Sequence, residues 1–157
     1  MGFGIAILLS EKKLSIDKYR AFVDACTCTI GKWILHELEP LNLNASETVH
    51  DFSLANGAHD RVWVNLDRRE FMRKYGRSRR KIFWQIYLET KAGRDAESLA
   101  LQFLIPVHAF TFFENPVVVV ECLPEKVFLE RINYEMFAQR QIALACGEQF
   151  INSLALQ

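Results

Sequence analysis

Two histidine–aspartate doublets are the residues whose types and spacing could do chemistry in this sequence. His50-Asp51 and His59-Asp60 stand on either side of Asn56-Gly57. An imidazole and a carboxylate together can bind a metal ion or share a proton. If a hairpin closes at Asn56-Gly57, the doublets lie near one another on facing strands. One hypothesis is therefore a small metal-dependent hydrolase that uses His50, Asp51, His59 and Asp60.

The simpler interpretation of these doublets is that they are polar residues flanking a turn. Strand alternation can place His50 and Asp51 on opposite faces, which would separate the imidazole from the carboxylate. Only His36 and His108 remain as further imidazoles, and both stand in apolar surroundings. No phosphate-binding loop, nucleophile elbow or zinc-protease helix motif occurs. We therefore assign no catalytic or metal-binding residue and expect no cofactor.

The four cysteines, Cys26, Cys28, Cys122 and Cys146, do not form a metal-binding pattern. Cys26 and Cys28 fall in a helical pattern, where two residues are about 200° apart around the axis. The set also lacks paired CxxC spacing. Free, buried thiols in a reducing compartment are the favoured interpretation.

Charge is concentrated in one short segment, from Arg68 to Lys81. It holds one acid, Glu70, and eight basic residues: Arg68, Arg69, Arg73, Lys74, Arg77, Arg79, Arg80 and Lys81. That segment has a net charge of +7. The remainder, with eleven basic and eighteen acidic side chains, carries −7. Such a field attracts an anionic partner, more strongly at low salt than at high salt.

The eight basic residues are the candidate partner-binding site. The alternative is a solvated turn whose cations pair with nearby acids. Arginine outnumbers lysine six to two in this segment, and guanidinium forks suit carboxylate and phosphate recognition. The arginine content favours a binding role.

Three functions follow, in order of preference. The first is a non-catalytic protein-binding protein, of the small bacterial immunity or inhibitor type, that neutralises a toxin or enzyme by occluding it. The second is a nucleic-acid-binding module that places the same arginines on phosphates. The third is the hydrolase described above. The expected partner is thus a protein, with nucleic acid second and no membrane.

Length and composition fit one globular domain over residues 1–157. Half of the residues are hydrophobic and 24% are charged, with twelve Phe and three Trp, which is the composition of a folded domain. No basic residue precedes the apolar run at residues 3–9, and no run reaches the length of a membrane span. The cytosol is the expected location.

The elements that must position the site lie in residues 48–90. A hairpin is predicted at Asn56-Gly57, with alternating apolar residues on both sides. Asp67 and Gly76 resemble the N-cap and C-terminal glycine of a short basic helix. Residues 81–90 then read as a central strand covered on both faces.

The flanking sequence predicts a strand at residues 2–9, a helix at 16–39, a helix from 95 toward Pro106, a strand at 117–122 and helices from Pro124 onward. Residues 82–120 could form a right-handed βαβ crossover. The predicted fold is α+β. It has a single mixed sheet of about five strands, a central antiparallel hairpin, and helices packed mostly on one face.

Overall fold

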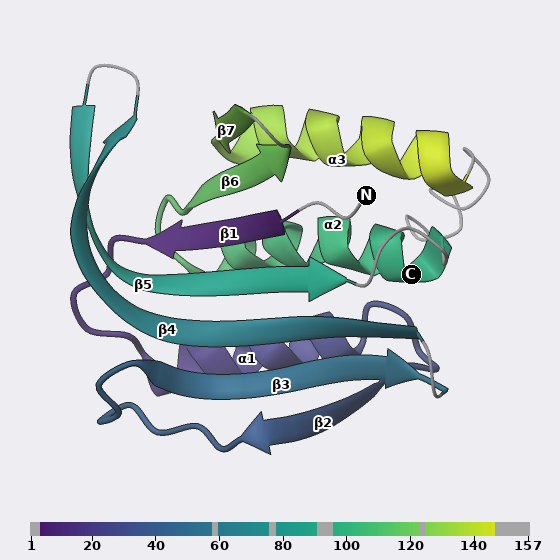
Figure 1. The fold of residues 1–157 in the computed structure, drawn as a ribbon, viewed down its shortest axis with the longest axis horizontal. Coiled ribbons are helices and arrows are strands. Elements are labelled where there is room, and N and C mark those ends of the chain that lie inside the picture. Colours follow the sequence, from purple (N-terminus) through teal and green to yellow (C-terminus); the bar gives the residue numbers. More distant parts are fainter. Residues whose placement is uncertain (1–3, 58–59, 76–77, 91–95, 123–124, 147–157) are drawn as a thin grey trace.

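The computed structural model describes residues 4–57, 60–75, 78–90, 96–122 and 125–146. These residues form seven strands and three helices (Figure 1), in the order β1 (Gly4–Leu9), α1 (Ile16–Thr27), β2 (Ile34–Glu39), β3 (Thr48–Asn56), β4 (Asp60–Tyr75), β5 (Ser78–Thr90), α2 (Ala96–Phe112), β6 (Val117–Cys122), β7 (Glu125–Leu129) and α3 (Arg131–Cys146).

One sheet contains all of these strands, in the order β2-β3-β4-β5-β1-β6-β7, and every neighbouring pair is antiparallel. The α+β class is confirmed. The predicted count of about five strands and the mixed pairing are wrong. Because β5 and β6 both pair with β1, they run in the same direction on either side of it. The segment between them therefore passes across β1 instead of joining adjacent strands.

The main core lies between the helices and one face of this sheet. Alternate strand residues meet the helices there, including Ile7, Val64, Ile86 and Val118, all of which have no exposed surface. Burial of each such side chain stabilises the fold by roughly 1.5–3 kcal/mol. The Tyr134 hydroxyl donates to the Phe103 carbonyl at 2.6 Å, which ties α3 to α2.

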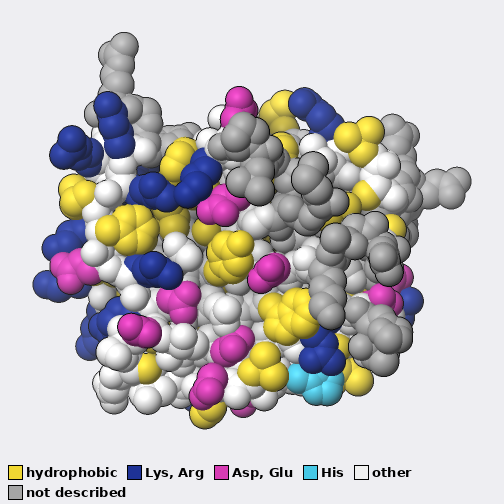
Figure 2. Space-filling model, in the orientation of Figure 1, with side chains coloured by type: hydrophobic (Ala, Val, Ile, Leu, Met, Phe, Trp, Pro, Cys, Tyr) yellow, Lys and Arg dark blue, Asp and Glu magenta, His cyan; other side chains and the backbone are white. Residues whose placement is uncertain are grey.

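The other face of the sheet, called the open face here, carries a smaller hydrophobic cluster without helix residues. It contains Ala6, Leu8, Ile82, Val117 and Val119, with Phe71, Tyr87 and Phe128 packed against them. In Figure 1 α1 and α2 lie behind the sheet and α3 lies along its β6–β7 edge, so Figure 2 shows the open face.

The hairpin at Asn56-Gly57 is confirmed, with a longer connection than a two-residue turn. Asn56 pairs with Asp60 as the last residue of β3, and Gly57 follows with φ of +73°. A side chain rarely adopts that conformation, so glycine is required there. Val62, Val64 and Leu66 are buried on one face as predicted.

The short basic helix predicted over residues 67–76 is wrong, because β4 continues through Tyr75 and pairs with β5 from Val62 to Tyr75, apart from an irregularity between Arg68 and Phe71. The antiparallel ladder satisfies the backbone groups and sends successive side chains to opposite sides. Asp67 is a strand residue and caps no helix, and Gly76 lies outside the described residues.

Two further helix predictions extend too far. The first helix begins as predicted, with the Ser15 hydroxyl accepting from the Lys18 backbone N–H, but it ends at Thr27. Residues 34–39 form β2 instead, paired with β3. Likewise residues 125–129 form β7 on the sheet edge, and the last helix begins only at Arg131. In both places the apolar residues have the spacing of a helix, but pairing with a neighbouring strand determines the structure.

The helix predicted toward Pro106 continues to Phe112, with the proline inside it. No helix within the described ranges is both long and apolar enough to cross a bilayer.

Candidate partner-binding surface

The basic segment forms a two-stranded arm that projects from the sheet. We define the arm as Phe71–Tyr75 of β4 and Ser78–Ile82 of β5, which remain paired in register after an irregularity between Arg68 and Phe71. Irregularities of this kind bend a strand and increase its local twist. In Figure 1 both strands turn there and rise beside the ends of β1 and β6.

The inner side of the arm is anchored to the rest of the protein. Ile82 and Phe71 join the hydrophobic cluster of the open face. The Arg80 guanidinium donates to the Asn115 carbonyl at 3.0 Å and forms an ion pair with Glu130 at 3.1 Å. These contacts connect the arm to the loop before β6 and to the start of α3, so the arm has a defined position.

The outer side of the arm points away from these contacts and displays cations. The cross-strand pairs Met72–Lys81 and Lys74–Arg79 alternate with the inner pairs, and all four side chains are exposed. Lys81 forms an ion pair with Glu70 at 2.9 Å. Lys74 and Arg79 form no hydrogen bond or ion pair within the described part of the chain. The outer side therefore offers unneutralised positive charge.

Two neighbouring arginines at the base of the arm, Arg68 and Arg69, have different surroundings. Arg68 donates from Nε to the Ala45 carbonyl at 3.3 Å and from Nη2 to the Leu43 carbonyl, and its guanidinium lies 4.6 Å from the centroid of the Trp84 ring. This side chain holds the loop before β3 against the sheet. Arg69 is exposed and makes no such contact in the described residues.

The eight predicted binding residues thus fall into different classes. Arg68 and Arg80 serve the fold, Lys81 has a nearby carboxylate, and Arg77 lies outside the described residues. Those that form no hydrogen bond or ion pair, in the part of the chain that the structure describes, are Arg69, Arg73, Lys74 and Arg79, of which Arg69 acts electrostatically on Asp67. Figure 2 shows lysine and arginine side chains gathered on the side of the molecule that carries the arm.

Carboxylates occupy the neighbouring part of the open face. Successive cross-strand pairs form one row across the sheet: Glu39, Asp51, Asn65, Tyr87, Ala6, Val119 and Phe128. Burial raises the pKa of Asp51, and the charges of Glu39 and Asp67 raise it further. Burial also raises the pKa of Asp67, against the lowering effect of Arg69. Acidic side chains therefore crowd one end of the row.

Tyr87 stands in the middle of this row because Gly4 leaves room for it. A Cβ on Gly4 would lie 2.7 Å from the Tyr87 hydroxyl and 3.3 Å from a carboxylate oxygen of Glu121. Burial, followed by the charges of Glu121 and Glu89, raises the pKa of Tyr87. The phenol thus stays protonated at neutral pH and can donate to an acceptor on a partner.

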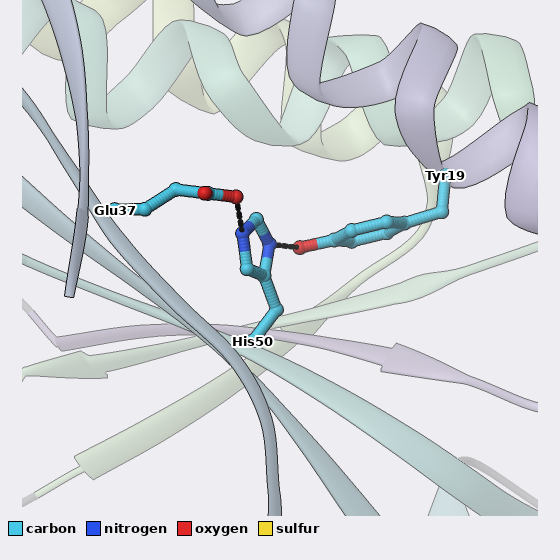
Figure 3. Close-up of polar contacts among 3 residues, drawn as sticks. All are labelled: Tyr19, Glu37 and His50. Carbon is cyan, nitrogen blue, oxygen red and sulfur yellow. Dashed lines mark hydrogen bonds and ion pairs between the residues drawn. The ribbon is translucent and has the colours of Figure 1, made fainter. Parts of the chain in front are cut away.

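His50 belongs to the interior and not to this surface. Its side chain is only 4% exposed and lies between Tyr19 of α1 and Glu37 of β2 (Figure 3). Nε2 is 2.9 Å from a Glu37 oxygen, and Nδ1 is 2.5 Å from the Tyr19 hydroxyl. A carboxylate only accepts hydrogen bonds, so Nε2–H donates to Glu37, and in the neutral imidazole Nδ1 then accepts from the Tyr19 hydroxyl. Burial raises the pKa of Tyr19, which keeps this donor protonated.

The structure separates the two residues of the first histidine–aspartate doublet. Asp51 lies on the open face, whereas its neighbour His50 faces the helices. Asp60 begins β4, and His59 lies outside the described residues. Within the described ranges, no group of three or more acidic, cysteine or histidine side chains could hold a metal ion.

The described cysteines are free: Cys26 is buried in α1 and Cys28 is exposed just after it. Burial raises the pKa of the Cys26 thiol, which makes it a poor nucleophile. The side chains of Cys122 and Cys146 lie outside the description.

Comparison with known proteins gives no relative. No family matches the sequence, no curated protein resembles it, and no solved structure matches the fold. The function must therefore be argued from the surface itself.

Sequence reasoning missed the acidic row and the anchoring of the arm. The signal for the row was present: Asp51 and Ser53 on one strand, and Trp63, Asn65 and Asp67 on the next, alternate with buried apolar residues. That alternation marks a half-exposed face. The contacts of Arg80 with Asn115 and Glu130 join residues far apart in sequence, and no local pattern predicts them.

Proposed function

We propose that this chain is a non-catalytic protein-binding protein of the immunity or inhibitor type, which docks on a toxin or enzyme through the arm and the adjoining open face. The observation that carries the proposal is the outer side of the arm. There, Lys74 and Arg79 are held in the β4–β5 ladder and form no hydrogen bond or ion pair with any residue that the structure describes. Fixed, unneutralised charge is what steers and orients a charged partner.

The juxtaposition of opposite charges supports a protein as the partner. A surface that meets both the arm and the acidic row must present acidic groups to one and basic groups to the other. A folded protein can supply both signs at fixed positions, and such complementarity gives specificity and fast association. Half-buried aromatic residues on the same face, Trp63, Tyr87 and Phe128, supply the apolar contact area that protein interfaces favour.

Nucleic acid is the second candidate, because arginine-rich ladders also suit phosphates. A strand passing from the arm onto the open face would meet Glu39, Asp51 and Asp67, whose charges repel a continuous phosphate backbone. This repulsion favours the protein partner over the nucleic acid.

The two candidates separate in one experiment. The immobilised protein is incubated with native lysate treated with nuclease, and recovered proteins are identified and quantified. We expect one protein in a stoichiometric amount, which is lost when Lys74 and Arg79 are both replaced by glutamate. In parallel, random oligonucleotides are tested by gel shift at low salt. A shift there, combined with no recovered protein, would contradict the proposal and favour the nucleic-acid alternative.

A further inference from the structure

Arg73 differs from its cross-strand neighbour Arg80 in a way that indicates a missing partner. Both belong to the inner side of the arm and face one another across the ladder. Arg80 has the Glu130 carboxylate and the Asn115 carbonyl. The guanidinium of Arg73 instead lies over two rings, 5.7 Å from the Phe71 centroid and 5.4 Å from the Phe128 centroid.

One guanidinium donor of Arg73 is buried and unsatisfied. Its Nε is buried without a hydrogen-bond partner, and no carboxylate or carbonyl of the described residues pairs with the rest of the group. A buried donor without an acceptor costs stability, and a partly buried cation without a counterion costs more. The quadrupoles of the two rings offset part of this cost through cation–π attraction but accept no N–H bond along the guanidinium edge.

The same arrangement prepares Arg73 to bind an anion. Its place beside Phe71 and Phe128 restricts the long side chain, so less conformational entropy is lost when the planar fork meets an acceptor. A carboxylate takes two parallel N–H bonds from such a fork. An arginine among aromatic side chains is also the composition of the few residues that dominate binding energy at protein interfaces.

We propose that Arg73 is the anchor of the interface and receives an aspartate or glutamate side chain of the protein partner. This inference rests on the proposed protein-binding function. Phe128 on β7 ends the cross-strand row whose other end, on β2 and β3, carries Glu39 and Asp51, so the anchor and the acidic end lie on one face of the sheet. A folded partner can present one carboxylate to Arg73 and other groups to the acidic end, whereas a nucleic-acid strand that crossed this face would bring a phosphate at every nucleotide.

The test uses an acetylated, amidated hexaglutamate peptide as the probe, with hexathymidylate as the competing anion. In ¹⁵N-labelled protein, the Nε–H signal of Arg73 is identified by its loss in Arg73→Lys. We expect that signal to shift in a saturable way with the peptide. We also expect about tenfold weaker peptide binding by Arg73→Lys, because lysine keeps the charge and loses the fork. Arg20→Lys, at an exposed position of α1, is the matched control and should change binding less than twofold.

Phe128→Leu gives an independent check, because it removes one stacking ring and keeps Arg73. We expect an intermediate loss of peptide affinity and an otherwise unchanged amide spectrum. Equal binding of the peptide by wild type and Arg73→Lys would contradict the proposal that Arg73 is the anchor. So would a hexathymidylate affinity at or above that of the peptide, since phosphate would then be the preferred ligand.

The anchor and the proposed function fail in different ways. Recovery of no protein by the wild-type bait contradicts the protein-binding function. Recovery of a partner that binds wild type and Arg73→Lys equally contradicts the anchor alone.

Discussion

The two ends of the β4–β5 ladder use the same backbone pairing for opposite purposes. In the sheet, Val64 and Leu66 of β4 and Ile86 of β5 have no exposed surface and pack beneath the helices. In the arm, Met72 is 57% exposed, and Lys74 and Arg79 project outward. The sheet end is stabilised by burial of its side chains. The arm is held in place by the β4–β5 ladder and by a few contacts on its inner side.

This difference separates the residues that determine stability from those available for binding. Burial fixes the sheet half, so substitutions there are costly. Exposed charges in the arm contribute only about 0–1 kcal/mol each to folding. The arm can therefore carry a net positive charge without loss of the fold that presents it.

The largest expected effect comes from truncating matched apolar residues at the two ends of β4. Leu66→Ala should lower the free energy of unfolding by about 2–5 kcal/mol, because it leaves a cavity in the core. Met72→Ala should change it by less than about 0.5 kcal/mol, because the side chain is already in water. Urea denaturation of both variants measures the comparison. Similar losses would mean that the arm belongs to the cooperative core.

Tyr19→Phe should have the next largest effect. It removes the donor to His50 Nδ1 in a buried site, and an unsatisfied buried acceptor costs about 1–3 kcal/mol. Glu37→Gln is the control, because an amide oxygen still accepts from Nε2–H and the Glu37 side chain is 51% exposed. Thermal unfolding of both variants is the measurement. An unchanged Tyr19→Phe protein would show that this hydrogen bond contributes nothing to the fold.

Asp51→Asn should raise the melting temperature at pH 7 by about 2 °C. The folded protein holds the Asp51 proton more tightly than the unfolded chain does, since burial and then Glu39 and Asp67 raise the pKa above 3.8. The ionised carboxylate thus costs stability at neutral pH. That cost disappears as the pH falls through the raised pKa to below 3.8.

Melting curves at pH 7 and pH 3.5 check this prediction, with Glu125→Gln on the exposed edge strand β7 as the control for loss of one charge. The gain from Asp51→Asn should shrink at the lower pH. A gain that stays constant with pH would show that the acidic row does not strain this part of the open face.

Sequence reasoning correctly predicted the strands in which apolar and polar residues alternate, because one face of each strand is buried. The β3–β4 hairpin, the strand after Ser78 and the strand at Val117 all carry such a pattern or a β-branched run. The arm carries neither, because its inner side mixes Phe71 with Arg73 and its outer side mixes Met72 with Lys74. Because apolar residues occur on both sides of the arm, their spacing in the sequence also fits a helix. Only the pairing of β4 with β5 determines that this segment is a strand.

The candidate site was predicted in composition and not in arrangement. Eight cations in fourteen residues mark a charged surface from the sequence alone. Which of them remain free depends on Glu130, Asn115, Ala45 and Phe128, which reach the arm from distant segments. Local sequence carries no record of those contacts.

The most direct test of the account measures the affinity of the recovered partner for the variant with Lys74→Glu and Arg79→Glu, together with its melting temperature. We predict at least tenfold weaker binding, a larger loss at low salt than at high salt, and a melting temperature within about 4 °C of wild type. Unchanged affinity in a folded variant would contradict the claim that the outer side of the arm binds the partner.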